Sequence, residues 1–136
     1  EYISGSELTV GILEEEALPV IQILPDSRCY DYEAKYTSDK TQFLIPAPIR
    51  DAVTEAVQQA ALKAHEALGC GPFSRVDLLL NKKEEPIILE VNALPGLTGR
   101  SLLPRASVAA GISFLELCER ILVMAIQMNP VRNVNF

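Results

Sequence analysis

Four polar side chains, Arg75, Asp77, Glu90 and Asn92, flank two apolar segments and have the types that bind metal ions and anions. Residues two apart in a strand share a face, so Arg75 points with Asp77, and Glu90 points with Asn92. Leu89 and Val91 are expected on the opposite face. If the two segments pair, one guanidinium, two carboxylates and one amide meet on one face of a sheet.

Oxygen ligands without His or Cys suit a hard cation such as Mg²⁺, which takes one or two carboxylates together with water and substrate phosphate. A neighbouring Arg75 suits a transferring phosphoryl group or an oxyanion. The alternative is an internal ion pair of Arg75 with Asp77 or Glu90 on a solvated face. The spacing alone leaves both interpretations open.

The segment after Asn92 has the composition of an anion-binding loop. Gly96 lets the backbone approach a ligand closely, and Thr98 and Ser101 add hydroxyls beside Arg100. A simple turn is the alternative. We predict a loop over residues 96–100.

A second loop is predicted from residue 25 to residue 40, which is polar and shows little apolar periodicity. Lys35 lies between Tyr32 and Tyr36, and a lysine on a loop supplies a point charge for phosphate. A solvated surface lysine is the alternative. His65 is interpreted as a surface or boundary residue without a catalytic role.

Strand and helix patterns along the chain position these residues. Strands are expected at 7–13 and 18–24 as an antiparallel pair, at 43–45, and as a hairpin at 76–80 and 87–91 with a polar connector. Apolar residues at helical spacing predict a helix over 51–68 that ends at Gly69.

A second helix is predicted to begin at a capping box of Ser113 and Glu116. It is apolar nearly all round up to Met128, the pattern of a buried helix. Residues 129–136 show no pattern and are expected to form a tail. Together these elements predict an α+β domain over residues 1–128, with a largely antiparallel sheet and flanking helices.

The composition limits the functional classes. The 136 residues suffice for one domain with a core, and 18 acidic against 12 basic residues give a net charge of −6, which argues against nucleic-acid binding. No apolar run reaches the roughly 20 residues of a membrane span. Three separated cysteines, Cys29, Cys70 and Cys118, are expected to be reduced thiols. We expect a soluble cytoplasmic protein and, because Glu1 leads into a strand pattern, part of a longer one.

Several strings, in this order and at this spacing, resemble the D-alanine–D-alanine ligases of the ATP-grasp superfamily. They are ELTV at 7–10, YDYEAKYT at 30–37, RVD at 75–77, LEVN at 89–92, PGLT at 95–98 and SL at 101–102. The resemblance extends to about Ala125 and covers only the C-terminal part of such an enzyme. It implies the ATP-grasp C-terminal subdomain, with the amino-terminal and central domains of the same enzyme absent.

The resemblance also implies a reaction. The family joins two D-alanines with ATP: a phosphoryl group passes to the first carboxylate, and the second amine attacks the acyl phosphate. The intact enzyme is expected in the bacterial cytoplasm, where it supplies peptidoglycan precursors, with a homodimer as one expected assembly. The isolated fragment is expected to be inactive.

The resemblance implies roles for individual residues, which are grouped here by ligand. Two Mg²⁺ ions, with Mn²⁺ as a substitute, would be held by Asp77, Glu90 and Asn92. ATP would be bound by Glu1, Ile3, Glu7, Lys35 and Leu79. Arg75 and the Gly96 N–H would stabilise the oxyanion, Ser101 and Leu102 would hold the second D-alanine, and Tyr36 would belong to a closing loop.

Two departures from the family pattern bear on specificity. Cys29 stands where an aromatic side chain is expected against adenine, and Ala93-Leu94 replaces a commoner pair before Pro95. Ligases that use D-lactate or D-serine share most of these strings, so another carboxylate–amine ligase remains an alternative. A nucleotide- or metal-binding module without catalysis is a second one.

Overall fold

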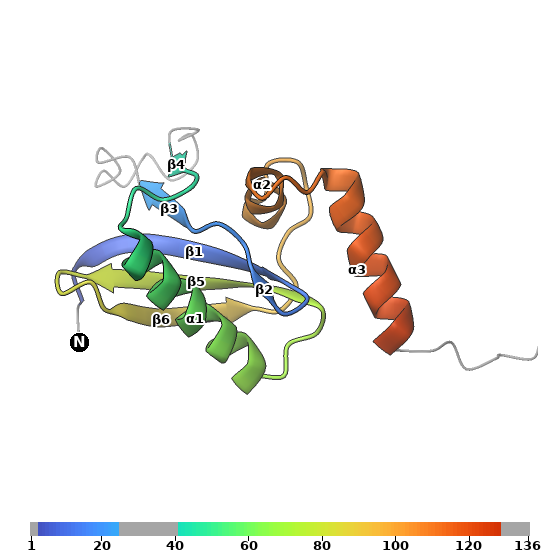
Figure 1. Ribbon diagram of the computed structural model, residues 1–136, viewed down its shortest axis with the longest axis horizontal. Helices are drawn as coiled ribbons and strands as arrows, with labels where there is room; N and C mark the ends of the chain where they lie inside the picture. The colour runs from blue at the N-terminus through green and yellow to red at the C-terminus, as the bar shows by residue number, and fades with distance from the viewer. Residues whose placement is uncertain (1–2, 25–40, 129–136) are drawn as a thin grey trace, which may run out of the picture.

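The computed structural model describes residues 3–24 and 41–128 (Figure 1). Its elements, in chain order, are β1 (Gly5–Leu13), β2 (Glu16–Ala17), β3 (Ile21–Leu24), β4 (Gln42–Leu44), α1 (Asp51–Ala67), β5 (Phe73–Asn81), β6 (Pro86–Asn92), α2 (Leu102–Ala109) and α3 (Phe114–Met128). The strands form one antiparallel sheet in the order β4-β3-β1-β5-β6, and β2 pairs with β1. The predicted α+β class is confirmed.

The β5–β6 hairpin carries most of the candidate site residues and forms where the sequence predicts it. The Asn81 side-chain oxygen accepts hydrogen bonds from the backbone N–H groups of Lys83 and Glu85, at 2.8 and 2.9 Å, which fixes the connector. Beyond the turn, β5 pairs with β1 over its whole length. The hairpin is therefore anchored to the centre of the sheet.

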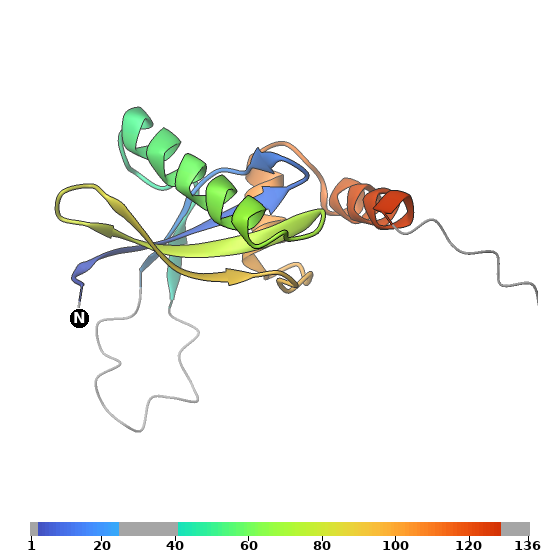
Figure 2. The same ribbon diagram turned by 90° about the horizontal axis from the view of Figure 1, so that it is seen from below.

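Helix α1 covers one face of the sheet (Figure 2). Its buried residues Val53, Val57 and Ala61 pack against alternate residues of β1 and β5, among them Val10 and Val76. Gly69 follows the helix with φ 59°, as predicted. Because α1 occupies this face, the intervening residues of β1 and β5 point to the opposite face.

Helix α2 lies on that opposite face and was not predicted. A Cβ atom added at Gly11 of β1 would lie 2.7 Å from a methyl carbon of Leu103, so the glycine makes room for the helix. Leu103 and Ala106 are buried there with Leu13 and Leu117. Pro104 stands in the first turn, where its missing N–H is harmless. Tertiary packing thus explains this short helix.

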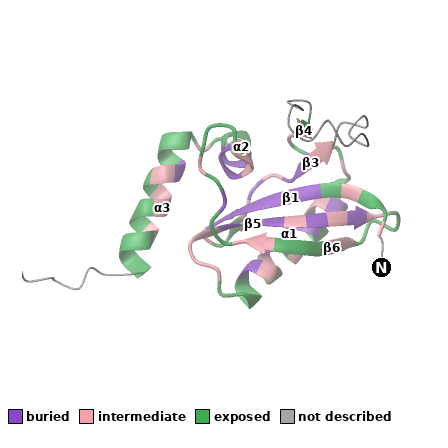
Figure 3. Ribbon diagram, turned by 180° about the vertical axis from the view of Figure 1, so that it is seen from behind, coloured by how far each residue is buried: buried purple, intermediate pink, exposed green. Residues whose placement is uncertain are grey.

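The prediction that the last helix is buried is wrong. The Ser113 hydroxyl accepts a hydrogen bond from the Glu116 N–H at 3.2 Å, so the predicted start of α3 is confirmed. Along its whole length, however, Leu117 is the single residue that is buried. Figure 3 shows α3 beside the end of the sheet with most of its surface exposed.

Two further predictions concern thiols and membranes. Cys70 and Cys118 are free thiols, and Cys29 lies outside the described residues. Among the helices that the structure describes, none has the length and hydrophobicity needed to cross a bilayer.

A buried hydrogen bond joins α1 to β5. His65 Nδ1 lies 2.7 Å from Ser74 Oγ, and both residues are buried, which corrects the expectation that His65 lies at the surface. Burial lowers the pKa of His65 below its ordinary value of 6.5, although the charge of Glu66 opposes this shift. His65 is therefore neutral in the folded protein at neutral pH.

This pKa shift predicts a pH-dependent stability. As pH falls below 6.5, the unfolded chain binds a proton at His65 before the folded chain does, so the free energy of unfolding decreases. When the pH is lowered from 7 to about 5, the Tm of His65→Gln is expected to fall less than the Tm of the unaltered chain. An equal loss in both proteins would contradict this assignment.

Candidate functional site

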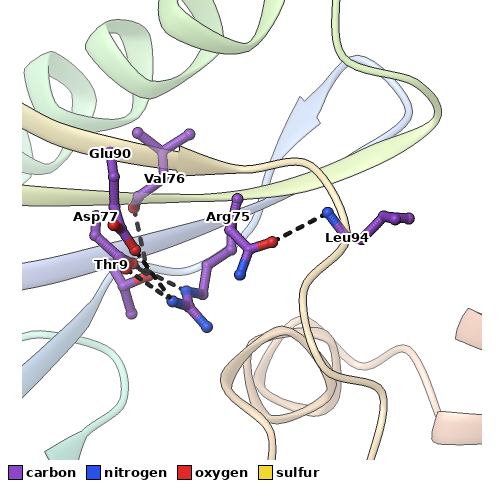
Figure 4. Close-up of polar contacts among 7 residues, drawn as sticks. Thr9, Arg75, Val76, Asp77, Glu90 and Leu94 are labelled. Atoms are coloured by element: carbon purple, nitrogen blue, oxygen red, sulfur yellow. Dashed lines mark hydrogen bonds and ion pairs between the residues drawn. The ribbon is translucent and has the colours of Figure 1, made fainter.

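Arg75, Asp77 and Thr9 form one hydrogen-bonded group on the sheet face opposite α1 (Figure 4). Arg75 Nε donates to Asp77 Oδ1 at 2.9 Å and Arg75 Nη2 donates to Oδ2 at 2.8 Å. The Thr9 hydroxyl donates to Asp77 Oδ1 at 2.6 Å. The group exists because β1 and β5 pair with Thr9 opposite Asp77.

The ionised form of Asp77 is favoured at this place. Burial by itself would raise the pKa of Asp77, but the hydrogen bonds from Arg75 and Thr9 outweigh it and hold the pKa below its ordinary value of 3.8. The same ion pair raises the pKa of Arg75. Both groups carry full charge at neutral pH, in side chains that are 15% and 21% exposed.

Glu90 and Asn92 lie on the same face, as the period of two predicts. In the register of β5 and β6, Glu90 is opposite Asp77 and Asn92 is opposite Arg75. A Glu90 oxygen is 4.0 Å from Arg75 Nη2, and the Glu90 side chain is 66% exposed. Two carboxylates and a guanidinium therefore meet at one place, and the predicted ion pair of Arg75 is present within it. The Asn92 amide lies on the same face, and its oxygen accepts a hydrogen bond from the Leu94 N–H at 3.0 Å.

One predicted orientation in β6 is not reproduced. The register shifts between Asp77 and Leu78, whose partners are Glu90 and Ile88, so Leu89 has no partner on β5. Leu89 is 52% exposed instead of sharing the packed face of Val91. This irregularity changes the alternation before Glu90 and leaves the site residues together.

The oxygen atoms of this group fit a Mg²⁺ ion bound together with phosphate. Asp77 Oδ1 already accepts two hydrogen bonds, whereas Oδ2 accepts one from the described residues and keeps a lone pair. The part of the chain that the structure describes has no cluster of three or more His, Cys, Asp or Glu residues suited to a metal. Two carboxylates and one amide match an ion that completes its shell with phosphate and water.

The loop that follows β6 is held together by Ser101. The Ser101 hydroxyl accepts a hydrogen bond from the Thr98 N–H at 3.1 Å and lies 2.9 Å from the Thr98 hydroxyl. A Cβ atom at Gly96 would be 2.8 Å from Ser101 Oγ, so a larger residue there would displace the Ser101 hydroxyl. Ser101 precedes α2 without a side-chain capping bond, and its hydroxyl contacts Thr98 instead.

The residues that the resemblance assigns to ATP follow the same strands. Glu7 of β1 is opposite Leu79 of β5, two positions along from Thr9 and Asp77, so both side chains lie on the site face. Glu7 is exposed, and Leu79 and Ile3 are partly buried. Along this face of the sheet, the candidate nucleotide-binding residues therefore lie next to the candidate metal-binding residues.

Three of the predicted site residues lie outside the described part of the chain: Glu1, Lys35 and Tyr36. Leu102, by contrast, is partly buried and packs at the edge of the cluster around Leu103. The structure therefore brings together the predicted metal residues and Arg75, and it places Gly96 and Ser101 in contact within the loop after β6.

Sequence reasoning missed the role of Thr9. Its hydroxyl is buried in an apolar strand, and its partner Asp77 is 68 positions along the chain. A signal was present, because Thr9 is two residues from Glu7 in an otherwise apolar strand and so shares its face.

The comparisons with known proteins agree on one family. The family model "D-ala D-ala ligase C-terminus" matches residues 1–123. A D-alanine–D-alanine ligase of Methylacidiphilum infernorum is 48% identical over 120 residues, which is 88% of this chain and 40% of that protein. The chain thus spans about two fifths of the length of such curated relatives.

Solved structures give the same result. A D-alanine–D-alanine ligase from Bacillus anthracis has a TM-score of 0.81 and 35% identity over 93% of this chain and 41% of its own. The VanG D-Ala:D-Ser ligase from Enterococcus faecalis has a TM-score of 0.76 and 32% identity over 91% of this chain and 37% of its own. The predicted resemblance is confirmed, and the chain belongs to the family of D-alanine–D-alanine ligase C-terminal domains.

Proposed function

We propose that this chain works as the carboxyl-terminal part of an ATP- and Mg²⁺-dependent D-alanine–D-alanine ligase. The observation that carries the proposal is the group of Arg75, Asp77 and Thr9 beside Glu90, which collects oxygen ligands and a guanidinium on one open sheet face. The names of the relatives and a B. anthracis ligase structure complexed with ATP support the same activity.

Asp77, Glu90 and Asn92 are proposed to hold two Mg²⁺ ions, with Mn²⁺ as a substitute. Such ions neutralise charge on the ATP phosphates. Asp77 contributes Oδ2, the oxygen with a remaining lone pair, and Glu90 contributes an exposed carboxylate. Glu7 and Leu79, with Ile3 and Glu1, are proposed to bind the nucleoside, and Lys35 a phosphate.

Arg75 and the Gly96 N–H are proposed to stabilise the oxyanion that develops when the second amine attacks the acyl phosphate. Asp77 uses two of the five guanidinium N–H donors, so three remain for substrate. Ser101 and Leu102 are proposed to hold the second D-alanine, in a loop already fixed by Thr98. Tyr36 is proposed to help exclude water.

The other components of the reaction lie outside this chain. Relatives are slightly more than twice as long, so half of the ATP site and the first D-alanine site are proposed to come from the preceding part of the enzyme. The whole enzyme is proposed to supply peptidoglycan precursors in the cytoplasm and to work as a homodimer. The likeness to a D-Ala:D-Ser ligase makes D-serine the alternative acceptor.

Phosphate release from ATP tests the proposed function. The protein purified from its own gene, here called the gene product, is weighed intact and assayed with ATP, Mg²⁺ and D-alanine. We expect a mass well above 14.9 kDa and release of phosphate that depends on D-alanine. Parallel assays with D-serine and D-lactate as second substrates identify the acceptor. Phosphate release that does not depend on added D-amino acids would refute the proposal.

A further inference from the structure

Helix α3 has an apolar side that holds it against the rest of the domain. Successive residues of an α-helix are about 100° apart around its axis. Leu117, Ile121 and Met124 fall on one side by this rule, and they pack in the cluster that contains Leu103 of α2. This contact accounts for only part of the apolar surface of α3.

A second apolar side faces the solvent. Leu115, Leu122 and Ile126 lie roughly 150° around the helix from the packed side. They are 68%, 61% and 52% exposed, and we call them the outer stripe. Exposed apolar residues that occur singly need no explanation, but three of them on one side of a helix indicate a surface that another body covers.

The polar residues of α3 occupy a narrow part of its circumference. Glu116, Glu119, Arg120 and Gln127 fall within roughly 100° of arc. Within that arc Arg120 binds Glu14 of the β1–β2 turn at 3.0 Å, which fixes how the helix is rotated against the domain. The outer stripe therefore points away from the domain, and turning it inward would lose both this ion pair and the packing of Leu117, Ile121 and Met124.

Charge argues against a second copy of this chain as the cover. The groove between α1 and α3, next to the stripe, is lined by Glu15, Glu16, Glu66 and Glu119. Two copies that met through this region would bring acidic rims together in a chain of net charge −6. A cover with basic groups at its edge fits better.

We propose that the outer stripe docks against the part of the ligase that precedes the matched region in the relatives. This inference rests on the proposed function. Relatives carry about 180 residues outside the matched region, enough for a body some 40 Å across. Strand β1 begins at the end of the sheet far from α3, so the chain connection and the stripe hold that body at two separate points (Figure 1).

Thermal unfolding of matched double variants tests the docking. Leu122→Gln with Ile126→Gln removes the stripe, and Leu68→Gln with Val108→Gln is the control, since Leu68 and Val108 are 67% and 60% exposed elsewhere. In the gene product we expect the stripe variant to lower the Tm by roughly 5–10 °C and the control to lower it little. In the 136-residue chain alone neither variant should change the Tm appreciably.

Three outcomes would overturn the docking proposal. One is an equal Tm for the stripe variant and the control in the gene product. Another is a 136-residue chain that sediments as a dimer and becomes monomeric in the stripe variant, since the cover would then be a second copy. The last is a gene product of only 14.9 kDa. A Tm shift without D-alanine-dependent phosphate release would support the docking and refute the proposed function.

Discussion

D-alanine-dependent phosphate release is expected to fall at least about a hundredfold when Glu90 of the gene product is replaced by Gln. Glu90 lies opposite Asp77 and is 66% exposed, so its carboxylate is accessible to a cation. Gln keeps the shape and removes the charge that Mg²⁺ requires. The Tm should stay nearly the same, because an exposed side chain contributes little to stability.

The matched control is Glu55→Gln on α1, which is exposed on the other side of the sheet and should leave phosphate release unchanged. Titration with Mg²⁺ separates a metal role from other losses, since the Glu90 variant should require more Mg²⁺ for half-maximal release. Near-normal release at low Mg²⁺ would refute the metal role of Glu90.

The central hairpin was predictable because its signals are local. Alternation with a period of two placed Arg75 with Asp77 and Glu90 with Asn92, and the polar connector predicted the turn that Asn81 fixes. Those patterns do not contain the register between β1 and β5, whose paired residues are at least sixty positions apart. The face of Thr9 follows from its spacing to Glu7, but its partner Asp77 depends on that register and was found only in the structure.

The helices show where periodicity misleads. The apolar pattern of α3 wrongly predicted a buried helix, because the outer stripe has no cover within the described residues. Helix α2 escaped prediction because it has only eight residues and no side-chain cap. Its stability comes from Leu103 packed over Gly11, a contact across 92 positions.

Asp77→Asn is expected to abolish phosphate release and also to destabilise the domain. Unlike Glu90, Asp77 is largely buried and is the partner of Arg75, so an uncharged amide would leave a guanidinium poorly compensated. Removing one partner of a fully buried ion pair lowers the free energy of unfolding by about 3–5 kcal/mol. Since the Arg75 side chain is 21% exposed, we expect a smaller decrease of about 1–3 kcal/mol. Urea unfolding of the 136-residue chain measures this loss.

The pH dependence of that loss identifies its cause. The pKa of Asp77 lies below 3.8 in the folded chain, so its ionised form stabilises the domain above this pH, and the stabilisation disappears as pH falls through the folded pKa. The difference between Asp77→Asn and the unaltered chain should therefore shrink below about pH 4. Thr9→Val removes one hydrogen bond to the same carboxylate and leaves the ion pair in place, so it should lower the free energy of unfolding by about 1–3 kcal/mol. A difference that persists unchanged at low pH would show that shape, and not the charge of Asp77, stabilises this face of the sheet.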